Sequence, residues 1–482
     1  MSENNTTHTS RRGLLKSVGM GAVIAADPLR SSRPNILMVL SDDHGVPHLG
    51  CYGDQVVQTP NLDRFAAEGM RFNSAYTTAP QCSPSRASIF TGYSPQRVHM
   101  TRLHALLPSE YRTFFEVLRE HGYYTGVAGR THHMDGLLGH RPWFAETYKR
   151  HGLQTMKNRV DLLHTGTQDE GLVQFGAFLD KKPKAAPFVF QLNFSDPHGP
   201  WDATDFEKRY HPDSIRVPEF MLDTPEIRES FVKYYAEISR ADELFGRIMR
   251  LLDGRGLREN TMVVFIGDNG TPLPFGKVTL YQYGWHVPLL IRWPGHVKPG
   301  SSNSELISGV DFFATFLEAA GAGVPKGTES HSFLNLLEGK PYQGREFVFA
   351  ACGWHDTFDM ARAVCSKTHS LIFNAWPEYR GPRIPAGYNV EREVAAGRLN
   401  PKTAAKWSRK SRPLYEMFDL RTDPHELDNI AGKAEYKDAE FTLKSAMSEW
   451  MEVSHDFLPP PFLNSQRLDA DPLRQGPELR RQ

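Results

Sequence analysis

Four short apolar runs have the pattern of strands that are buried on both faces of a sheet. Residues 36–40 read Ile-Leu-Met-Val-Leu and residues 262–266 read Met-Val-Val-Phe-Ile, and two further runs that are mainly apolar lie at 123–128 and 187–194. Unbroken apolar runs of this length are typical of parallel strands in α/β proteins, because helices cover both faces of such a sheet. The pattern therefore predicts a central sheet with several parallel strands.

Helical spacing predicts the elements between these runs. Residues 59–69 place their apolar side chains on one face, with Thr59-Pro60 at the start and a glycine at the end. Apolar residues also recur at helical spacing from Phe231 to Leu252, which predicts a long helix packed on the core. Strands that alternate with helices indicate an α/β domain.

Polar residues follow each of the four apolar runs directly. They occupy positions 41–43, 129–132, 195–198 and 267–270. In open α/β sheets the ligand crevice lies beyond the carboxyl ends of the strands. We therefore expect these four clusters to meet at one edge of the sheet.

The C-terminal part has a different pattern, with short strand-like runs and turns at 347–350, 363–365 and 371–373. This pattern predicts a smaller antiparallel unit. After residue 457 the chain is rich in proline and irregular. We divide the chain into a main domain at 31–345, a smaller α+β subdomain at 346–460 and an irregular tail at 461–482.

The first thirty residues have the pattern of an export signal. The sequence Ser10-Arg11-Arg12-Gly13-Leu14-Leu15-Lys16 resembles a twin-arginine signal, and a short, weakly apolar segment follows at 18–26. The resemblance implies the twin-arginine translocase as a partner and a periplasmic or secreted location in a bacterium. A disordered basic N-terminus is the alternative. No other stretch resembles a membrane span, so an integral membrane protein is not expected.

Composition narrows the function classes. The 482 residues contain 56 Lys and Arg and 56 Asp and Glu, so net charge gives no reason to expect nucleic acid as a partner. The length is sufficient for two to three domains, or for one large domain with an appendage. Four cysteines form no disulfide framework in a chain of this size, which leaves a thiol available for modification.

The most informative short sequence is Cys82-Ser83-Pro84-Ser85-Arg86. Pro84 suits the first turn of a helix and Gly92 its end, so Cys82 is expected just ahead of a helix N-terminus, where backbone N–H groups favour an anion. Together with residues 87–92, this run resembles the signature of type I sulfatases of the alkaline phosphatase superfamily. A buried cysteine before an ordinary helix is the alternative.

This resemblance implies a fold, a modification and an activity. The implied fold is an alkaline phosphatase-like α/β/α sandwich with a large mixed sheet, plus a smaller C-terminal subdomain with an antiparallel sheet. Cys82 is implied to become formylglycine, whose hydrated aldehyde is the nucleophile that attacks sulfur. The corresponding partner is a formylglycine-generating or anaerobic sulfatase-maturing enzyme.

Four residues after two of the strands offer only oxygen ligands, namely Asp42, Asp43, Asp268 and Asn269. Hard oxygen ligands with excess negative charge select Ca²⁺ or Mg²⁺ over zinc. Taken singly, such residues are more often turns or helix caps. The sulfatase resemblance implies that the four bind Ca²⁺, which also contacts the modified Cys82, and the ligand chemistry leaves Mg²⁺ open.

The remaining catalytic candidates are cations and histidines. Arg86, Arg130 and Lys277 can hold the sulfate oxygens, and His132 and His198 can transfer protons. Two positions depart from the family pattern. Arg130 stands where the family usually has lysine, and Ser195 stands where many relatives have histidine.

Residues 267–281, 423–426 and 455–456 resemble N-sulfoglucosamine sulfohydrolases, the heparan sulfamidases, which implies a sulfated saccharide as substrate. His355 and Asp356 in the smaller domain are candidates for contacting the sugar. Trp201 and Trp354 either stack on a sugar ring or pack against the protein.

Two alternatives of other classes stay open at this point. One is a phosphonate or phosphate monoester hydrolase of the same superfamily, since such enzymes can carry the same Cys-x-Pro-Ser-Arg run. The other is a glycan-binding protein without catalytic activity.

Overall fold

The computed structural model describes residues 33–135, 142–355, 358–376 and 381–458. The predicted export signal at 1–30, Asp356 and the predicted tail at 461–482 lie outside these described residues. Within the described ranges, no helix is long and apolar enough to cross a membrane.

The strands are β1 (Asn35–Ser41), β2 (Met70–Phe72), β3 (Ala75–Tyr76), β4 (Tyr124–Gly129), β5 (Leu162–Thr165), β6 (Phe188–Asn193), β7 (Thr261–Gly267), β8 (Leu289–Arg292), β9 (Ser301–Asn303), β10 (Ile307–Ser308), β11 (Val348–Trp354), β12 (Phe358–Cys365), β13 (His369–Asn374) and β14 (Tyr415–Asp419). The α-helices are α1 (Pro60–Glu68), α2 (Cys82–Thr91), α3 (Phe114–Glu120), α4 (Pro142–Arg150), α5 (Met156–Arg159), α6 (Gln168–Lys181), α7 (Thr204–Glu207), α8 (Pro225–Gly254), α9 (Gln282–Trp285), α10 (Asp311–Ala319), α11 (Leu334–Leu337), α12 (Val390–Ala395), α13 (Pro401–Ser408) and α14 (Lys437–Val453).

The larger sheet is mixed, as predicted. In the part of the chain that the structure describes, it contains eight strands in the order β5-β4-β6-β1-β7-β8-β2-β9. The strands from β5 to β7 are mutually parallel, whereas β8 is antiparallel to both β7 and β2. The four predicted strands are β4, β6, β1 and β7, and they lie side by side at the centre.

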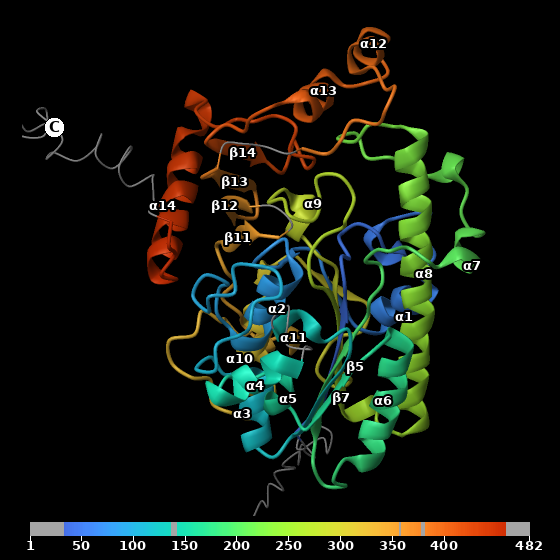
Figure 1. Ribbon diagram of the computed structural model, residues 1–482, viewed down its shortest axis with the longest axis vertical. Coiled ribbons are helices and arrows are strands. Elements are labelled where there is room, and N and C mark those ends of the chain that lie inside the picture. Colours follow the sequence, from blue (N-terminus) through green and yellow to red (C-terminus); the bar gives the residue numbers. More distant parts are fainter. Residues whose placement is uncertain (1–32, 136–141, 356–357, 377–380, 459–482) are drawn as a thin grey trace, which may run out of the picture.

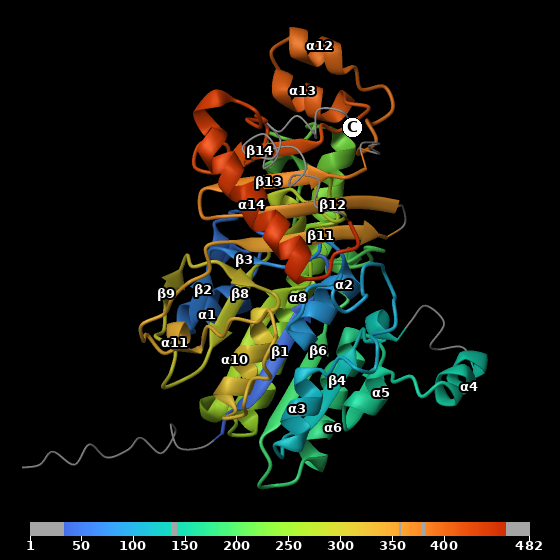
Figure 2. The same ribbon diagram turned by 90° about the vertical axis from the view of Figure 1, so that its left-hand side faces the viewer.

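Helices cover both faces of this sheet (Figures 1 and 2). Along β1, Leu37 and Val39 belong to the apolar cluster that contains α1, α6 and α8. Ile36, Met38 and Leu40 point to the opposite cluster, with α2, α3 and α10. Successive side chains of a strand alternate between faces, so an apolar run without interruption is what burial on both faces requires.

The smaller sheet is antiparallel, in the order β11-β12-β13-β14. The helix α14 packs on it through a third apolar cluster that includes Val364, Leu371 and Met447. Figure 2 shows this unit above the large sheet, with α14 across it. The predicted antiparallel unit is therefore confirmed, while its boundary at residue 345 stays a prediction.

Candidate active site

The four predicted polar clusters do meet at one edge of the large sheet. The register pairs Leu40 at the end of β1 with Asn193 of β6 and Ile266 of β7, and it pairs Gly129 of β4 with Asn193. An added Cβ at Gly129, which has a φ of 86°, would lie 2.1 Å from the carbonyl oxygen of Asn193. Glycine is therefore needed where β4 turns into the site.

Cys82 is the first residue of α2, one position further into the helix than the sequence indicated. Gln81 is extended and accepts the N–H of Ser85 at 3.1 Å, so it serves as the N-cap. Gly92 ends the helix in the left-handed region, as predicted, with a φ of 73°. Every residue of α2 is buried. The helix therefore presents Cys82 to the edge of the sheet from the protein interior.

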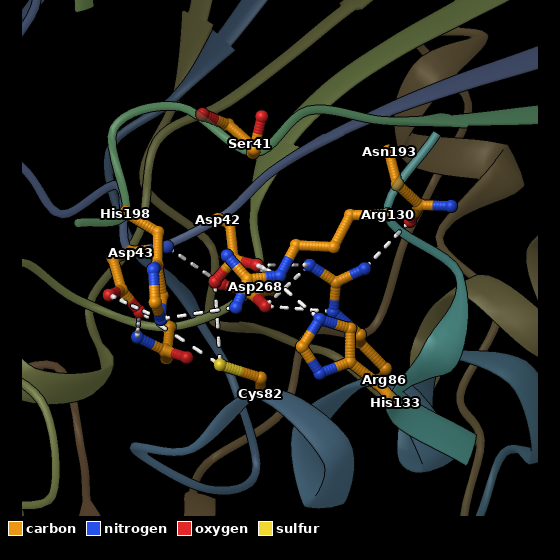
Figure 3. Close-up of polar contacts among 12 residues, drawn as sticks. Ser41, Asp42, Asp43, Cys82, Arg86, Arg130, His133, Asn193, His198 and Asp268 are labelled. Atoms are coloured by element: carbon orange, nitrogen blue, oxygen red, sulfur yellow. Dashed lines mark hydrogen bonds and ion pairs between the residues drawn. The ribbon is translucent and has the colours of Figure 1, made fainter. Parts of the chain in front are cut away.

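Three carboxylates surround the thiol of Cys82 (Figure 3). Its Sγ lies 3.4 Å from Oδ1 of Asp42 and 4.0 Å from Oδ1 of Asp43. One ligand atom from each of Cys82, Asp42, Asp43 and Asp268 lies within 4.8 Å of the others, and all four residues are buried. Asp43 also adopts a left-handed backbone with a φ of 63°, a conformation that is uncommon outside glycine and occurs often at functional sites.

Asn269 completes the oxygen cluster. Its Nδ2 donates to Oδ1 of Asp43 and to the carbonyl of Gly270, both at 2.8 Å. Its Oδ1 is buried and has no hydrogen-bond partner among the residues that the structure describes. Such an acceptor is costly unless something binds it. The predicted ligand residues therefore fit a hard divalent cation by both charge and donor type.

Arg86 balances part of this negative charge. Its Nε and Nη2 both lie 2.8 Å from Oδ2 of Asp268, and Nη2 lies 3.2 Å from Oδ2 of Asp42. Its Nη1 donates to Oδ1 of Asn193 at 2.7 Å. Each of the three guanidinium nitrogens thus lies within 2.8 Å of a protein oxygen. The predicted contact of Arg86 with sulfate oxygens stays a prediction.

The neighbouring carboxyls of Asp42 and Asp268 have pKa values that are shifted in opposite directions. Burial raises the pKa of Asp268 to about 7, with the charge of Asp42 adding to the effect and Arg86 opposing it. Burial acts on Asp42 in the same direction, but Arg130, Arg86 and His133 hold its pKa well below the usual range. Asp42 is therefore the permanently charged member of the pair.

The thiol of Cys82 is poorly suited to act as a nucleophile itself. Burial and the adjacent charge of Asp42 raise its pKa well above the ordinary value, and Lys277 offsets this only in part. Because the thiolate is the reactive form, the unmodified side chain has little reactivity at neutral pH. Burial beside carboxylates therefore argues against catalysis by the cysteine as such.

The side chains of Arg130 and His198 reach toward each other at the cluster (Figure 3). The Nε of Arg130 is 3.3 Å from Oδ2 of Asp42, and its Nη2 is 3.4 Å from Nε2 of His198. The same Nε2 lies 3.8 Å from Oδ2 of Asp43. Both side chains are partly exposed, so a ligand can reach them.

Lys277 approaches from the segment between β7 and α9. Its Nζ lies 2.6 Å from Oδ1 of Asp43. The flanking Phe275 and Val278 both have positive φ values, 63° and 61°, which for a β-branched residue is a strained backbone. The N–H of Val278 donates to Pro80 at 2.8 Å, which fixes this segment next to α2. A constrained loop therefore holds Lys277 at the site, where the sequence predicts it.

His133 and His104 also lie at the site, and the sequence did not indicate them. Nε2 of His133 is 3.4 Å from Oδ2 of Asp42, and the rings of the two histidines are 5.6 Å apart. The N–H of His104 donates to Oγ of Ser83 at 2.8 Å, next to the nucleophile position. Burial and the charge of Arg130 lower the pKa of His104. The side chain of the predicted His132 is not among those described.

The segment that carries His198 is anchored to α8 through buried charge. Nε and Nη2 of Arg240 contact the two carboxylate oxygens of Asp196 at 2.8 and 2.7 Å. The same Nη2 lies 2.5 Å from Oε2 of Glu237, whose pKa burial and Asp196 raise to about 8. The carbonyl of Asp196 accepts the Oγ of Ser41 at 2.9 Å. Asp196 thus ties the His198 segment both to the helix and to the end of β1.

We expect Arg240→Met to lower the free energy of unfolding by about 3–5 kcal/mol, because it leaves the buried carboxylate of Asp196 without its cation. The methionine keeps the aliphatic stem, so lost packing contributes little. Urea unfolding curves measure the change. Arg247→Met, about two turns further along α8 and exposed, is the matched control. Equal midpoints for the two variants would contradict the anchoring role.

A cavity of about 570 Å³ adjoins this cluster. It lies between the 272–281 segment and the smaller sheet, and Lys277, Trp354 and His355 are part of its lining. His355, a predicted sugar contact, is therefore placed at a cavity beside the site. Trp201 does not line it; its Nε1 donates to the carbonyl of Pro197 at 3.0 Å, so its described contact is packing on the His198 segment.

Comparison with known proteins gives a consistent result. A protein-family model described as Sulfatase matches residues 34–322. An ulvan-active sulfatase of Formosa agariphila is 29% identical over 461 residues, covering 88% of this chain and 76% of the relative. Two proteins of Homo sapiens follow: N-acetylgalactosamine-6-sulfatase at 31% identity, with 90% and 88% covered, and N-sulphoglucosamine sulphohydrolase at 28%, with 88% and 91% covered.

The fold is shared with solved structures as well. A protein in complex with its substrate D-glucosamine-2-N,6-O-disulfate superposes with a TM-score of 0.69 at 20% identity, covering 89% of this chain and 99% of that chain. At this identity the likeness shows the fold alone, which agrees with the predicted large mixed sheet and small antiparallel sheet.

Proposed function

The chain belongs to the sulfatase family of sulfuric ester hydrolases, and on that premise we propose that it releases sulfate from a sulfated glycan through formylglycine made from Cys82. The observation that supports this most is the position of Cys82, at the start of α2 and against the carboxylates of Asp42, Asp43 and Asp268. A thiol at that position is held in its unreactive protonated form, whereas the hydroxyls of a hydrated aldehyde need no thiolate to react.

Two groups would complete the site. Formylglycine at position 82 supplies, as a hydrated aldehyde, an oxygen nucleophile and a second hydroxyl for release of the sulfate. Ca²⁺, for which Mg²⁺ is the alternative, supplies Lewis-acid neutralisation of the sulfate oxygens. Asp42, Asp43, Asp268 and Asn269 would hold the cation, since the three carboxylates lie close together, Asn269 contacts Asp43, and Oδ1 of Asn269 has no hydrogen-bond partner within the described part of the chain.

The chain's own cations would orient the sulfate group. Arg130 and Lys277 each contact a carboxylate of the cluster and retain some exposure, 21% and 10% of their side chains. The planar fork of Arg130 can bind two sulfate oxygens, whereas Lys277 supplies a point charge. Arg130 therefore retains the charge of the family's lysine with a different geometry.

Histidines would move the protons. Nε2 of His198 lies within reach of both Arg130 and Asp43, on the exposed side of the cluster, which favours it as the acid that protonates the leaving group. His133 contacts Asp42 from the buried side. That position favours a role in accepting a proton from the group at position 82, and His132 stays a second candidate for it.

We further propose that the substrate is an amino-sugar sulfate or sulfamate such as the N-sulfoglucosamine of heparan. The relatives' names point to N-sulfated and 6-O-sulfated amino sugars and to ulvan, so the sulfated position is the part to be tested. Twin-arginine export to the periplasm, after maturation by a formylglycine-forming enzyme in the cytoplasm, belongs to the same proposal.

One experiment tests the activity and the sulfated position together. The protein is expressed with a maturing enzyme, and the mass of the peptide that contains residue 82 is measured by mass spectrometry. Sulfate release is then measured from N-sulfoglucosamine and from 6-O-sulfated N-acetylglucosamine. An aldehyde mass with release from the sulfamate supports the sulfamidase; release from the ester alone moves the substrate to O-sulfate. Hydrolysis of phosphate or phosphonate monoesters assayed in parallel, with no sulfate release from either sugar, would favour the superfamily alternative, and an aldehyde form inert to all of these substrates would favour a glycan-binding protein.

The raised pKa of Asp268 predicts how pH acts on the metal site. The pKa of the Asp268 carboxyl is about 7 in the folded protein and about 4 in the unfolded chain. Between these two pH values the carboxyl is protonated only in the folded protein, so the metal-free protein loses stability as the pH rises from about 4 to 7. A cation must displace that proton. We therefore expect Ca²⁺ to raise the unfolding temperature more at pH 8 than at pH 5.5, as measured by thermal unfolding with and without Ca²⁺.

The matched variant for this prediction is Asp268→Asn, which removes the titrating carboxyl and keeps its size. It should lose most of the stabilisation by Ca²⁺ at both pH values. A stabilisation by Ca²⁺ that is the same at pH 5.5 and pH 8 in the unsubstituted protein would show that Asp268 does not control the affinity.

A further inference from the structure

Three exposed aromatic side chains gather at the cavity beside Lys277. Trp354, Phe358 and Trp376 all line it, and they are 51%, 41% and 44% exposed. The ring centroids of Trp354 and Phe358 are 5.8 Å apart, and those of Phe358 and Trp376 are 5.5 Å apart, with edge-to-face geometry in both pairs. We call these three residues the aromatic rim. They form a contiguous group of exposed aromatic side chains, and contiguous exposed apolar patches often mark binding sites.

Backbone contacts hold the aromatic rim in place. The N–H of Trp354 donates to the carbonyl of Thr101 at 3.1 Å, and that of Trp376 donates to Met360 at 3.2 Å. Nη2 of Arg412 donates to the carbonyl of Trp376 at 2.8 Å and also pairs with Asp359 at 2.5 Å. The rim is therefore a preformed surface, as ligand sites usually are.

The cavity lies next to the nucleophile position, although Cys82 is not part of its lining. Gly353, which lines the cavity, exchanges two hydrogen bonds with the side chain of Gln81, at 3.4 and 3.5 Å. Gln81 directly precedes Cys82. Figure 2 shows β11 and β12 immediately above α2. A substrate with its sulfate at Cys82 and Lys277 would therefore extend into this cavity.

The lining combines flat apolar surface with polar groups at the edges. Besides the aromatic rim it contains Asp359, Asn374, Arg412 and Glu416, which offer hydrogen-bond donors and acceptors. A pyranose ring has the complementary pattern, with C–H groups on its faces and hydroxyls around its edge. The volume of about 570 Å³ lies within the range of about 300–1,000 Å³ that is typical of small-molecule pockets.

We propose that the aromatic rim binds a second sugar ring, joined by a glycosidic bond to the sulfated residue, so that the preferred substrate is an oligosaccharide rather than a monosaccharide. This inference rests on the proposed function, because it places the sulfated residue at Cys82. It adds specificity-determining residues, Trp354, Phe358 and Trp376, none of which belongs to the catalytic cluster.

The test compares chain lengths on the mature protein. Sulfated mono- and disaccharides with the same non-reducing residue are prepared from heparin, chondroitin sulfate and ulvan, and kcat/KM is measured for each pair. We expect the disaccharide of the accepted glycan to be preferred at least about tenfold. Trp376→Ala and Phe358→Ala should remove most of that preference through KM while leaving hydrolysis of the monosaccharide within about twofold. Trp376→Phe should retain part of it.

Phe441→Ala is the matched control, since Phe441 is 46% exposed on α14 and does not line the cavity. It should leave the preference unchanged. Equal kcat/KM for mono- and disaccharide, or a preference that survives both alanine substitutions, would overturn the inference while the sulfatase activity stands. Hydrolysis of 4-nitrophenyl sulfate with no release from any saccharide would instead overturn the proposed glycan substrate, and this inference with it.

Discussion

Cys82→Ala should abolish sulfate release, with a loss of at least about 10⁴-fold in kcat, while the protein stays folded. Alanine cannot be converted to formylglycine and offers no oxygen nucleophile. Cys82→Ser should lose as much wherever the serine escapes conversion, because a single hydroxyl attacks sulfur but leaves no second hydroxyl to expel the sulfate. The measurement is sulfate release by protein whose residue 82 has been identified by peptide mass.

Cys365→Ala is the matched control for this prediction. Its thiol is as buried as that of Cys82, but it lies in β12 of the smaller sheet, away from the carboxylate cluster. All four cysteines of the chain are free, so neither substitution breaks a disulfide. We expect Cys365→Ala to keep its turnover. Normal turnover by purified Cys82→Ala would contradict the role proposed for formylglycine.

The strands and the polar clusters at their ends could be predicted because one physical rule governs both. A strand buried on both faces needs an unbroken apolar run, and the first polar residue after it marks the edge of the sheet. Asp42, Asp43 and Asp268 were found in this way, and the structure brings them together as expected. The antiparallel unit could be predicted from a different signal, the short strand-like runs and turns after about residue 345.

Residues that reach the site by a local turn or from a neighbouring helix could not be found by that rule. His133 faces Asp42 because a short 3-10 helix spans His132–Met134. No periodicity in the sequence predicts that helix. Arg240 has the pattern of an exposed charge on an amphipathic helix. Only the packing of α8 on the sheet shows that it pairs with the buried Asp196. Contacts of this kind depend on tertiary structure rather than on local pattern.

The second large effect is expected at Arg86, whose side chain is only 2% exposed. Arg86→Met should lower the free energy of unfolding by about 3–5 kcal/mol, because the buried Asp268 loses its ion pair and the buried Asp42 keeps only Arg130 and His133 as partners. It should also reduce turnover by at least about 10²-fold, since the freed carboxylates and Asn193 no longer hold their positions to within an ångström. Urea unfolding and sulfate release measure the two effects separately.

Calcium distinguishes charge balance from geometry at this position. If the main loss in Arg86→Met is uncompensated negative charge, saturating Ca²⁺ should restore part of the stability, because the cation binds the folded carboxylate cluster and not the unfolded chain. Turnover should stay low, since a bound cation does not replace the hydrogen bonds from Arg86 to Asp268 and Asn193.

Arg86→Lys, which keeps the positive charge but not the planar guanidinium, should be more stable than Arg86→Met and nearly as inactive. Arg216→Met, at an exposed arginine, should change neither quantity. Full activity in Arg86→Lys would show that charge alone matters here and that the geometry of the guanidinium does not.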